Sequence, residues 1–313
     1  MLVQKKNCRL VLDSCCDLPR EILDNAGVEF FRFPFIMNDG EHSDDLGETM
    51  SPKEFYDRLR NGEVSGTAQI PLQQLTEKLE EYAEDGTPMV YLAFTAGLSG
   101  TFETVTRLVG DLQKKYPKWE CYVVDSLLAS VAEGLLAYEA IRQYQRGMTA
   151  AELAAWAEEA RWYVNCLFTC DGLESLRRGG RIPDAAARLG EKLSLNPLLN
   201  FNADGTLALA GVARGRKKSL KALVEEFKEN HDATNAASET IIVGSADDEG
   251  SARWVSDHLD LGKNSIPPLM CSIGPTIGSH VGPNMVAIVF WGDDRRKNIS
   301  IADRIAGKLK GKK

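Results

Sequence analysis

Residues 89–102 read M-V-Y-L-A-F-T-A-G-L-S-G-T-F and contain a complete transition from a strand to a helix. The apolar run 89–94 is typical of a buried strand, and a helix is expected to begin near Phe102. Between them lies a polar loop, 95–101, with two glycines and three hydroxyl residues. In open α/β sheets, such loops follow the carboxyl ends of the strands, where ligands bind. The stretch therefore indicates both a fold class and a candidate site.

The same alternation of strands and helices extends through the first half of the chain. Further apolar runs predict strands at 9–13, 28–37 and 121–125. Helix starts are indicated at 51–54 and 149–152, where a Ser or Thr precedes a Glu by three residues in the manner of a capping box. The alternation predicts a mainly parallel sheet with helices on both of its faces.

The second half begins near Tyr163 and shows a similar pattern. Its apolar runs predict strands at 167–169, 240–244 and 285–290. Residues 202–205, N-A-D-G, are typical of a hairpin turn. At roughly 150 residues per domain, 313 residues fit two domains. We expect an α/β fold with two lobes, 1–162 and 163–313, each a mainly parallel sheet flanked by helices.

The composition is that of an ordinary globular protein, with 43% hydrophobic and 26% charged residues. The formal net charge of −8 disfavours a nucleic-acid-binding protein, because such proteins carry a basic surplus. No run of 18 apolar residues predicts a membrane span, and residues 1–13 lack the apolar segment of a secretory signal. We therefore expect a cytoplasmic protein. The basic run 308–313 predicts a solvated end, with transient contact to a membrane surface as the alternative.

The cysteines and histidines do not form a metal-binding pattern. Seven cysteines occur without a C-x-x-C pair, and four histidines do not complete a zinc motif. Reduced thiols that serve as small core residues are the simpler interpretation. We expect neither a metal nor a cofactor.

Two loops place hydroxyl groups just before a predicted helix. In loop 95–101, Thr95 and Ser99 lie where exposed N–H groups at a helix start favour a carboxylate or a phosphate. Loop 65–71, S-G-T-A-Q-I-P, places Thr67 in a similar position. The alternative for both loops is a cap that satisfies only its own backbone, and for 65–71 this alternative is favoured.

Two further segments carry charged or titratable side chains. Residues 273–284 contain three glycines and two prolines around His280, which can donate to an anion or act as an acid or base. A single histidine is more often structural. The segment 214–218, R-G-R-K-K, is expected to be mostly solvated or to face a partner, although one arginine can reach an anion.

Together these segments resemble the DegV family of bacterial fatty-acid-binding proteins, which includes the FakB proteins. The family's motifs occur in the same order over nearly the whole chain. They are D-S-x-x-D-L-P at 13–19, the hydroxyl loops at 67–71 and 95–101, D-S at 125–126, L-x-x-G-G-R-I at 176–182, the segment that begins at Arg214, and the glycine-rich loop around His280.

The resemblance implies a two-domain α/β protein that holds one lipid between its domains. In relatives, hydroxyl groups of the two loops hold the acyl carboxylate, and the His and Arg segments lie near it. By position, the candidate ligand-binding residues are Thr67, Thr95, Ala96, Ser99, Arg214 and His280. Ala68 and Ala96 replace hydroxyl residues of the family, and if either replaced hydroxyl is the direct ligand in relatives, a backbone N–H, Thr67 or Thr95 must substitute for it here. Asn284 likewise replaces the last glycine of G-P-G.

The resemblance also implies a partner protein. In the family, a separate fatty-acid kinase phosphorylates the bound carboxylate to an acyl phosphate. This chain has no G-x-x-x-x-G-K-[ST] loop, so we expect it to present the substrate and not to bind ATP or catalyse the reaction. The run 177–181, R-R-G-G-R, is a candidate docking surface, and a solvated turn is the alternative.

Two other functions are compatible with the residues. Residues 97–101, G-L-S-G-T, differ by one residue from the nucleophile motif G-x-S-x-G, which allows a serine hydrolase with Ser99 as nucleophile and His280 as base. However, the sequence offers no clear acid to complete the triad. The other alternative is a carrier of a different anionic lipid or small acid on the same scaffold.

Overall fold

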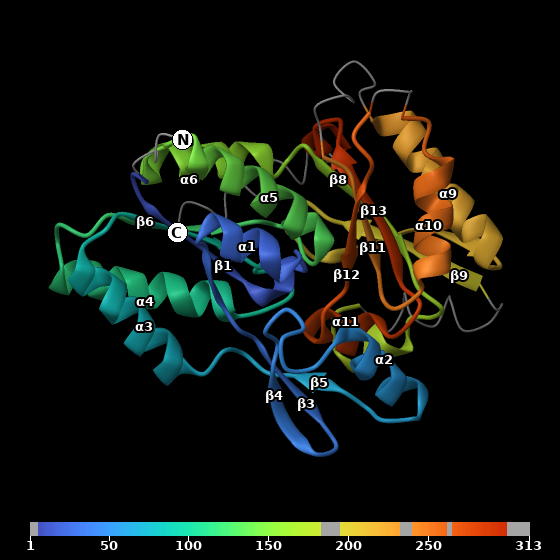
Figure 1. Cartoon of the computed structure of the whole chain (residues 1–313), viewed down its shortest axis with the longest axis horizontal. Helices are drawn as coiled ribbons and strands as arrows, with labels where there is room; N and C mark the ends of the chain where they lie inside the picture. The colour runs from blue at the N-terminus through green and yellow to red at the C-terminus, as the bar shows by residue number, and fades with distance from the viewer. Residues whose placement is uncertain (1–5, 183–194, 232–239, 262–264, 299–313) are drawn as a thin grey trace.

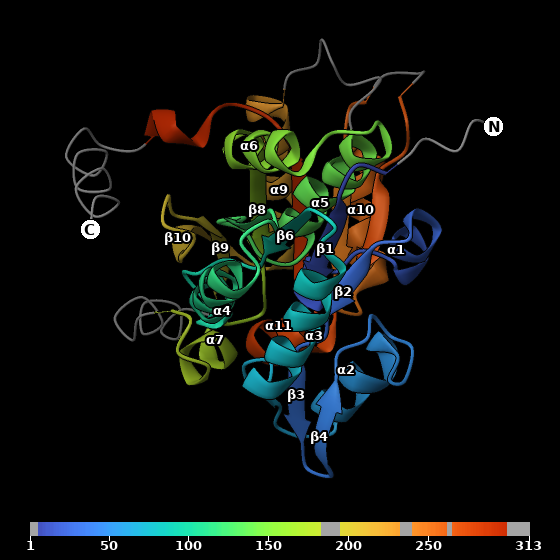
Figure 2. The same ribbon diagram turned by 90° about the vertical axis from the view of Figure 1, so that its left-hand side faces the viewer.

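The computed structural model of the chain describes residues 6–182, 195–231, 240–261 and 265–298. Within these residues the strands form sheets of four, six and three strands, with helices packed around them (Figures 1 and 2). The predicted α/β class is confirmed. None of the helices in these segments is long and apolar enough to cross a lipid bilayer. The basic run 308–313 lies outside the described residues.

The four-stranded sheet comes from the first half of the chain and is parallel throughout. In the order β2-β1-β6-β7, its strands are Glu29–Phe31, Arg9–Asp13, Met89–Ala93 and Cys121–Asp125. Every residue of β6 is buried, as expected for a parallel strand that is covered on both faces. The predicted parallel sheet is confirmed for this half.

The helices described in the first half are η1 (Ser14–Cys16), α1 (Arg20–Ala26), α2 (Pro52–Arg60), α3 (Leu72–Asp85), α4 (Thr101–Lys115), α5 (Val131–Gln145) and α6 (Ala150–Ala160). Of these, α2, α3, α4 and α6 begin close to the starts predicted from the sequence. The Ser51 hydroxyl accepts the Glu54 N–H at the start of α2. Thr149 and Glu152 form a complete capping box at the start of α6.

The six-stranded sheet comes from the second half of the chain. In the order β10-β9-β8-β13-β11-β12, its strands are Leu207–Arg214, Leu195–Phe201, Val164–Thr169, Val286–Trp291, Ile242–Ser245 and Leu269–Ser272. Only β11 and β12 are parallel, and the other neighbouring pairs are antiparallel. The prediction of a mainly parallel sheet in this lobe is therefore wrong, although strands were expected close to β8, β11 and β13, with a hairpin at 202–205; β12 was not expected.

Chain connectivity explains this antiparallel direction. A tight turn joins β9 to β10, and the Asn202 N–H donates to the Thr206 carbonyl within it at 2.8 Å. A turn this short joins only antiparallel strands. In addition, β13 inserts between β8 and β11, so its neighbours in the sheet are distant along the chain. Apolar runs in the sequence report burial of a strand and not its direction.

The third sheet is small and was not expected from the sequence. In the order β4-β3-β5, it contains Gly40–Ser43, Pro34–Met37 and Gly66–Thr67. The single strand predicted at 28–37 is divided between β2 and β3. Strand β2 ends at Phe31 on the edge of the parallel sheet, and Pro34 is the first residue of β3, a position at which a strand tolerates proline. Strand β5 places Thr67 beside Phe35.

The six-stranded sheet is buried on both faces. Leu167 and Ile288 belong to one face, which packs against α9 (Arg216–Asn230) and α10 (Glu249–His258). Cys166, Phe168 and Ala287 belong to the other face and share a hydrophobic cluster with the first sheet. Helix α5 contacts β1 of the first sheet and β13 of the second. One continuous core therefore joins the two halves of the chain.

Two short helices lie at one end of the six-stranded sheet. These are α7 (Glu174–Arg178), which follows β8, and α11 (Pro275–Val281), which precedes β13. They contact each other, and α11 also contacts β5 of the small sheet (Figure 2). At the other end of β13 the chain forms η2 (Arg295–Asn298). The division into domains 1–162 and 163–313 stays a prediction.

The turn between β9 and β10 packs directly on the loop that follows β6. Gly205 in this turn has φ of +77°, and a Cβ there would lie 1.9 Å from Thr95 Oγ1. Gly86 has a similar φ of +73° but no atom within 4 Å of its Cβ position. Gly86→Ala therefore measures the cost of the backbone conformation alone, about 1–2 kcal/mol.

We expect Gly205→Ala to lower the free energy of unfolding more than Gly86→Ala does, by an additional amount of about 1–3 kcal/mol from overpacking against Thr95. Urea unfolding of the two variants and the parent chain measures the difference. Equal losses for both variants would show that the turn does not press on the loop.

Candidate functional site

A cavity of about 190 Å³ lies between the loops of the first sheet and one face of the six-stranded sheet. Most of its lining is apolar and includes Phe33, Phe94, Phe168, Leu176, Phe201 and Leu207. An apolar cavity of about 150 Å³ is known to stay dry and to take up apolar molecules. The lining therefore favours a hydrocarbon ligand over a polar one.

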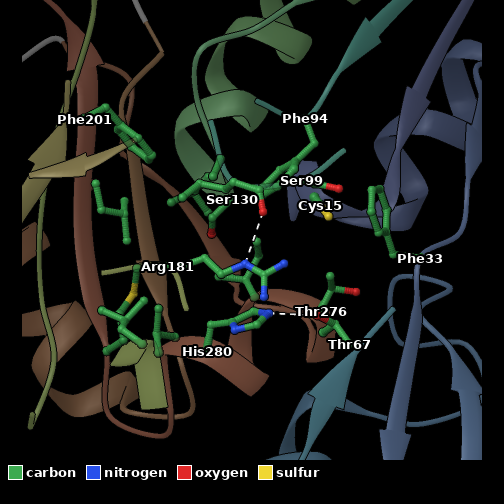
Figure 3. Close-up of a pocket in the computed structure, with 18 of the residues that line it drawn as sticks. Cys15, Phe33, Thr67, Phe94, Ser99, Ser130, Arg181, Phe201, Thr276 and His280 are labelled. Carbon is green, nitrogen blue, oxygen red and sulfur yellow. Dashed lines mark hydrogen bonds between the residues drawn. The ribbon is translucent and has the colours of Figure 1, made fainter. Parts of the chain in front are cut away.

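Polar side chains gather at one end of this cavity. Thr67, Ser99, Arg181 and His280 line it there, and Figure 3 shows Arg181 and His280 between Ser99 and Thr67. Thr67 Oγ1 and His280 Nε2 are hydrogen bonded at 2.8 Å. The cavity thus has an apolar body and one polar end, the arrangement that suits an amphipathic molecule.

His280 is held in place from several sides. The next residue toward the N-terminus, Ser279, is hydrogen bonded to Ser65 at 2.6 Å between the two hydroxyl oxygens. Gly179, which follows α7, lies against the imidazole, and a Cβ at that position would be 2.1 Å from His280 Nδ1. Only glycine leaves room for the ring there. This contact gives a structural reason for the first glycine of the R-R-G-G-R run.

The environment of His280 keeps its imidazole neutral. Burial, together with the positive charges of Arg181 and Arg178, lowers the pKa of His280 from 6.5 to about 4. Its Nδ1 atom is buried and has no hydrogen-bond partner. At pH 7 the ring therefore offers one N–H and one acceptor nitrogen, and Thr67 occupies only one of its two sides.

Arg181 is the site residue that the sequence reasoning missed as a ligand group. Its Nε donates to the Leu98 carbonyl at 3.1 Å, which brings the arginine to loop 95–101. Burial lowers the pKa of Arg181, but it remains a cation. Among the described residues, no carboxylate oxygen lies within ion-pair distance of it. The R-G-G-R pattern indicated a turn but not that its last arginine points inward.

The structure brings only three of the predicted site residues together at the cavity, namely Thr67, Ser99 and His280. Thr95 is buried beside it, where its hydroxyl donates to the Gly205 carbonyl at 3.2 Å and accepts the Gly97 N–H at 3.0 Å. The Ala96 N–H donates to Asp125 at 3.3 Å.

Arg214 is exposed at the end of β10 and does not line the cavity. Leu98, Ser99 and Gly100 are the residues of loop 95–101 that line the cavity, and Ser99 is the one among them with a polar side chain.

Buried carboxylates attach α11 to the first half of the chain. Asp17 accepts the Gly274 N–H at 2.8 Å and the Ser130 hydroxyl at 2.5 Å. Asp44 accepts both the N–H and the hydroxyl of Thr276, at 3.0 and 2.6 Å. Burial raises the pKa of both carboxyls, that of Asp44 to about 6. These bonds fix the start of α11 and so determine where His280 lies.

The geometry does not assemble a hydrolase triad. The Ser99 hydroxyl donates to Thr101 Oγ1 at 3.1 Å, and His280 bonds to Thr67 instead. No carboxylate accepts from His280, because its second ring nitrogen has no hydrogen-bond partner. Hydrolase chemistry requires hydrogen bonds from the nucleophile to a base and from the base to an orienting acid. This chain of hydrogen bonds is not formed here.

The position of Arg181 leads to a prediction for His280. We expect the His280 imidazole to titrate with a pKa of about 4, and Arg181→Gln to raise that pKa because the nearest positive charge is removed. Arg178→Gln is the matched control and should raise it less, since Arg178 is the smaller of the two charge effects. The NMR chemical shift of the His280 ring against pH measures all three values. An ordinary pKa near 6.5 in the parent chain would contradict the buried geometry.

Comparison with known proteins relates this architecture to one family. A family model described as "Uncharacterised protein, DegV family" matches residues 7–293. A DegV domain-containing protein of Clostridium perfringens is 33% identical over 283 residues, which cover 90% of this chain and 97% of that one. A DegV domain-containing protein of Streptococcus pyogenes is 28% identical over 288 residues and covers 92% of this chain and 99% of its own.

Solved structures agree with this relationship. A DegV family protein from Thermus thermophilus, described by its fatty acid binding, matches with a TM-score of 0.78 and 25% identity, over 91% of this chain and 99% of that one. A stearic-acid-binding protein from Eubacterium ventriosum shares the fold, with a TM-score of 0.77 and 22% identity over 93% of this chain and all of its own (100%). The resemblance found in the motifs is confirmed, and the chain belongs to the DegV family.

Proposed function

We propose that this protein binds a long-chain fatty acid, with the acyl tail in the apolar cavity and the carboxylate at its polar end. The observation that carries the proposal is the cavity itself, which is apolar along its body and has Thr67, Ser99, Arg181 and His280 together at one end. The Thermus thermophilus relative, described by its fatty acid binding, supports the same ligand class. A carrier of another anionic lipid is the alternative on the same site.

Tail and head group contribute differently to binding. Burial of a methylene group contributes about 0.8 kcal/mol, so a tail of about 16 carbons contributes roughly 12 kcal/mol before the costs of association. A hydrogen bond to the head group contributes about 1 kcal/mol net. We therefore assign retention of the lipid to the tail, and its orientation to the polar end of the cavity.

The charges at the polar end suit a carboxylate. Arg181 brings a half-buried positive charge without a partner carboxylate, and its guanidinium can donate two parallel bonds to a carboxylate. The Thr67 and Ser99 hydroxyls, which bond to His280 and Thr101 in this structure, can rotate to donate to the head group instead. Thr95 and the Ala96 N–H are proposed to position the loop beside the head group, and Arg214 to face a partner protein from the surface.

We further propose that the carboxylate is presented to a fatty-acid kinase, which phosphorylates it to an acyl phosphate. Around the polar end, Gln69 and Arg178 are exposed while Ser99 and Arg181 are half-buried, so a partner has access to this end of the cavity. In this proposal the ligand lies between the lobes 1–162 and 163–313. The chain itself is then a non-enzymatic cytoplasmic carrier without a cofactor or a nucleic-acid partner, in transient contact with a membrane surface at most.

Native mass spectrometry of the purified protein tests the ligand. We expect one bound fatty acid per chain, or uptake of one equivalent of hexadecanoic acid by protein that was first delipidated. A bound mass that corresponds to a different anionic lipid would favour the alternative carrier. Absence of any co-purifying lipid, combined with no uptake of fatty acids, would refute the proposal.

The division between tail and head group gives a second test. Thr67→Val, Ser99→Ala and His280→Ala should each reduce the rate of acyl-phosphate formation with the kinase at least tenfold, while hexadecanoate affinity changes by less than about tenfold, since one or two hydrogen bonds are lost. Thr106→Val, on the exposed face of α4, is the matched control and should change neither quantity. Complete loss of lipid in all three cavity variants would contradict the assignment of lipid retention to the acyl tail.

A further inference from the structure

A second cavity of about 180 Å³ adjoins the first and has a polar lining. Its polar residues include Asn165, Asn200, Glu226, Asn230 and Arg295. Cys166 and Phe201 line both cavities, so the two share a wall made by these two residues. This second cavity is not part of the polar end that holds Thr67 and His280.

The shared wall coincides with a gap in the pairing of the six-stranded sheet. Strands β8 and β9 pair through Phe168 with Leu199 and Thr169 with Leu198. If this pairing continued for two more residues, toward the start of β8 and the end of β9, Cys166 would lie opposite Phe201. The ladder ends before that point. Each residue is paired on its other side instead, Cys166 with Val289 and Phe201 with Leu207. The two strands therefore separate where the cavities meet.

The two polar regions lie at opposite ends of the same strand. Helix α11, which carries His280, immediately precedes β13, and Arg295 follows it. Six residues of β13 span about 20 Å, comparable with an extended long acyl chain. Figure 3 shows Phe201 on the far side of the first cavity from His280. A tail whose carboxylate lies near His280 therefore points toward the shared wall.

The second cavity contains donors that lack acceptors. Within the part of the chain that the structure describes, Arg295 Nε and Nη1 are buried without a hydrogen-bond partner, and Nη2 alone of the guanidinium nitrogens donates, to the Arg161 carbonyl at 3.1 Å. Neighbouring acids are engaged elsewhere, Asp293 with Lys297 and Asp294 with Arg296. Asn200 has no side-chain hydrogen bond among the described residues. Buried donors of this kind are costly unless a ligand or water supplies an acceptor.

We propose that the second cavity binds the far end of the acyl chain when that end carries a hydroxyl group, so that the protein accepts ω-hydroxy long-chain acids. The inference rests on the proposed fatty-acid binding. A hydroxyl accepts from Arg295 and donates to Glu226, which lines the same cavity. A second carboxylate suits the cavity less, because it would lie beside the like charge of Glu226, which forms no ion pair among the described residues.

Competition binding to delipidated protein tests the inference with three acids of equal length. We expect 16-hydroxyhexadecanoic acid to bind within about threefold of hexadecanoic acid or more tightly. The 8-hydroxy isomer is the matched control and should bind at least tenfold more weakly, because its hydroxyl is buried among apolar side chains without a partner. If the 16-hydroxy acid is also weaker by tenfold or more, the inference is wrong while fatty-acid binding stands. If hexadecanoic acid itself does not bind, both the inference and the proposed function are wrong.

Substitutions in the second cavity provide an independent test. Arg295→Leu and Asn200→Leu should each weaken the 16-hydroxy acid about tenfold relative to hexadecanoic acid. Arg107→Leu and Asn25→Leu, at exposed positions of α4 and α1, are the matched controls and should leave that ratio unchanged. The ratio is measured on one sample, so Asn200→Leu, at a half-buried position of β9, keeps the test valid if Arg295→Leu fails to fold. An unchanged ratio in Asn200→Leu and in any folded Arg295→Leu protein would overturn the assignment.

Discussion

Two buried carboxylates determine the geometry on which the rest of the site depends. Asp17 and Asp44, from the first half of the chain, accept hydrogen bonds from Gly274 and Thr276 at the start of α11. Burial of a carboxyl group is costly unless the group is hydrogen bonded, so loss of these hydrogen bonds would destabilise the folded protein. They fix α11 against the small sheet, and His280 is thereby brought beside Thr67 on β5. The polar end of the cavity depends on this inter-segment attachment, which the Ser65–Ser279 hydrogen bond reinforces.

Close approach of backbone segments completes the enclosure. Gly205 in the β9–β10 turn lies against Thr95, and Gly179 after α7 lies against the His280 ring. At both positions a single methyl group would overlap with the side chain opposite. The loop after β6 therefore touches the second half of the chain on one side, while Arg181 reaches the same loop through the Leu98 carbonyl. The cavity is closed by contacts between segments more than 80 residues apart.

An overall charge of −8 coexists with a local preference for an anion. Asp17 and Asp44 are buried and hydrogen bonded within the protein, while Arg181 has no partner carboxylate among the described residues and His280 is neutral. The proposed ligand fits this arrangement at both ends. Its head group meets the cationic Arg181 and the neutral His280 at the α11 end of β13, and a hydroxyl at its far end would meet the unpaired donors of Arg295.

The sequence by itself determined the α/β class, the parallel first sheet, the helix starts at Ser51 and Thr149, and the family, because these depend on local periodicity, capping groups and motif order. It also identified Thr67, Ser99 and His280 as residues that meet at one cavity. Only the tertiary structure decided the antiparallel second sheet, the inward position of Arg181 and the exposed position of Arg214. Strand order and side-chain direction are determined by packing between distant segments, which no local pattern of residues records.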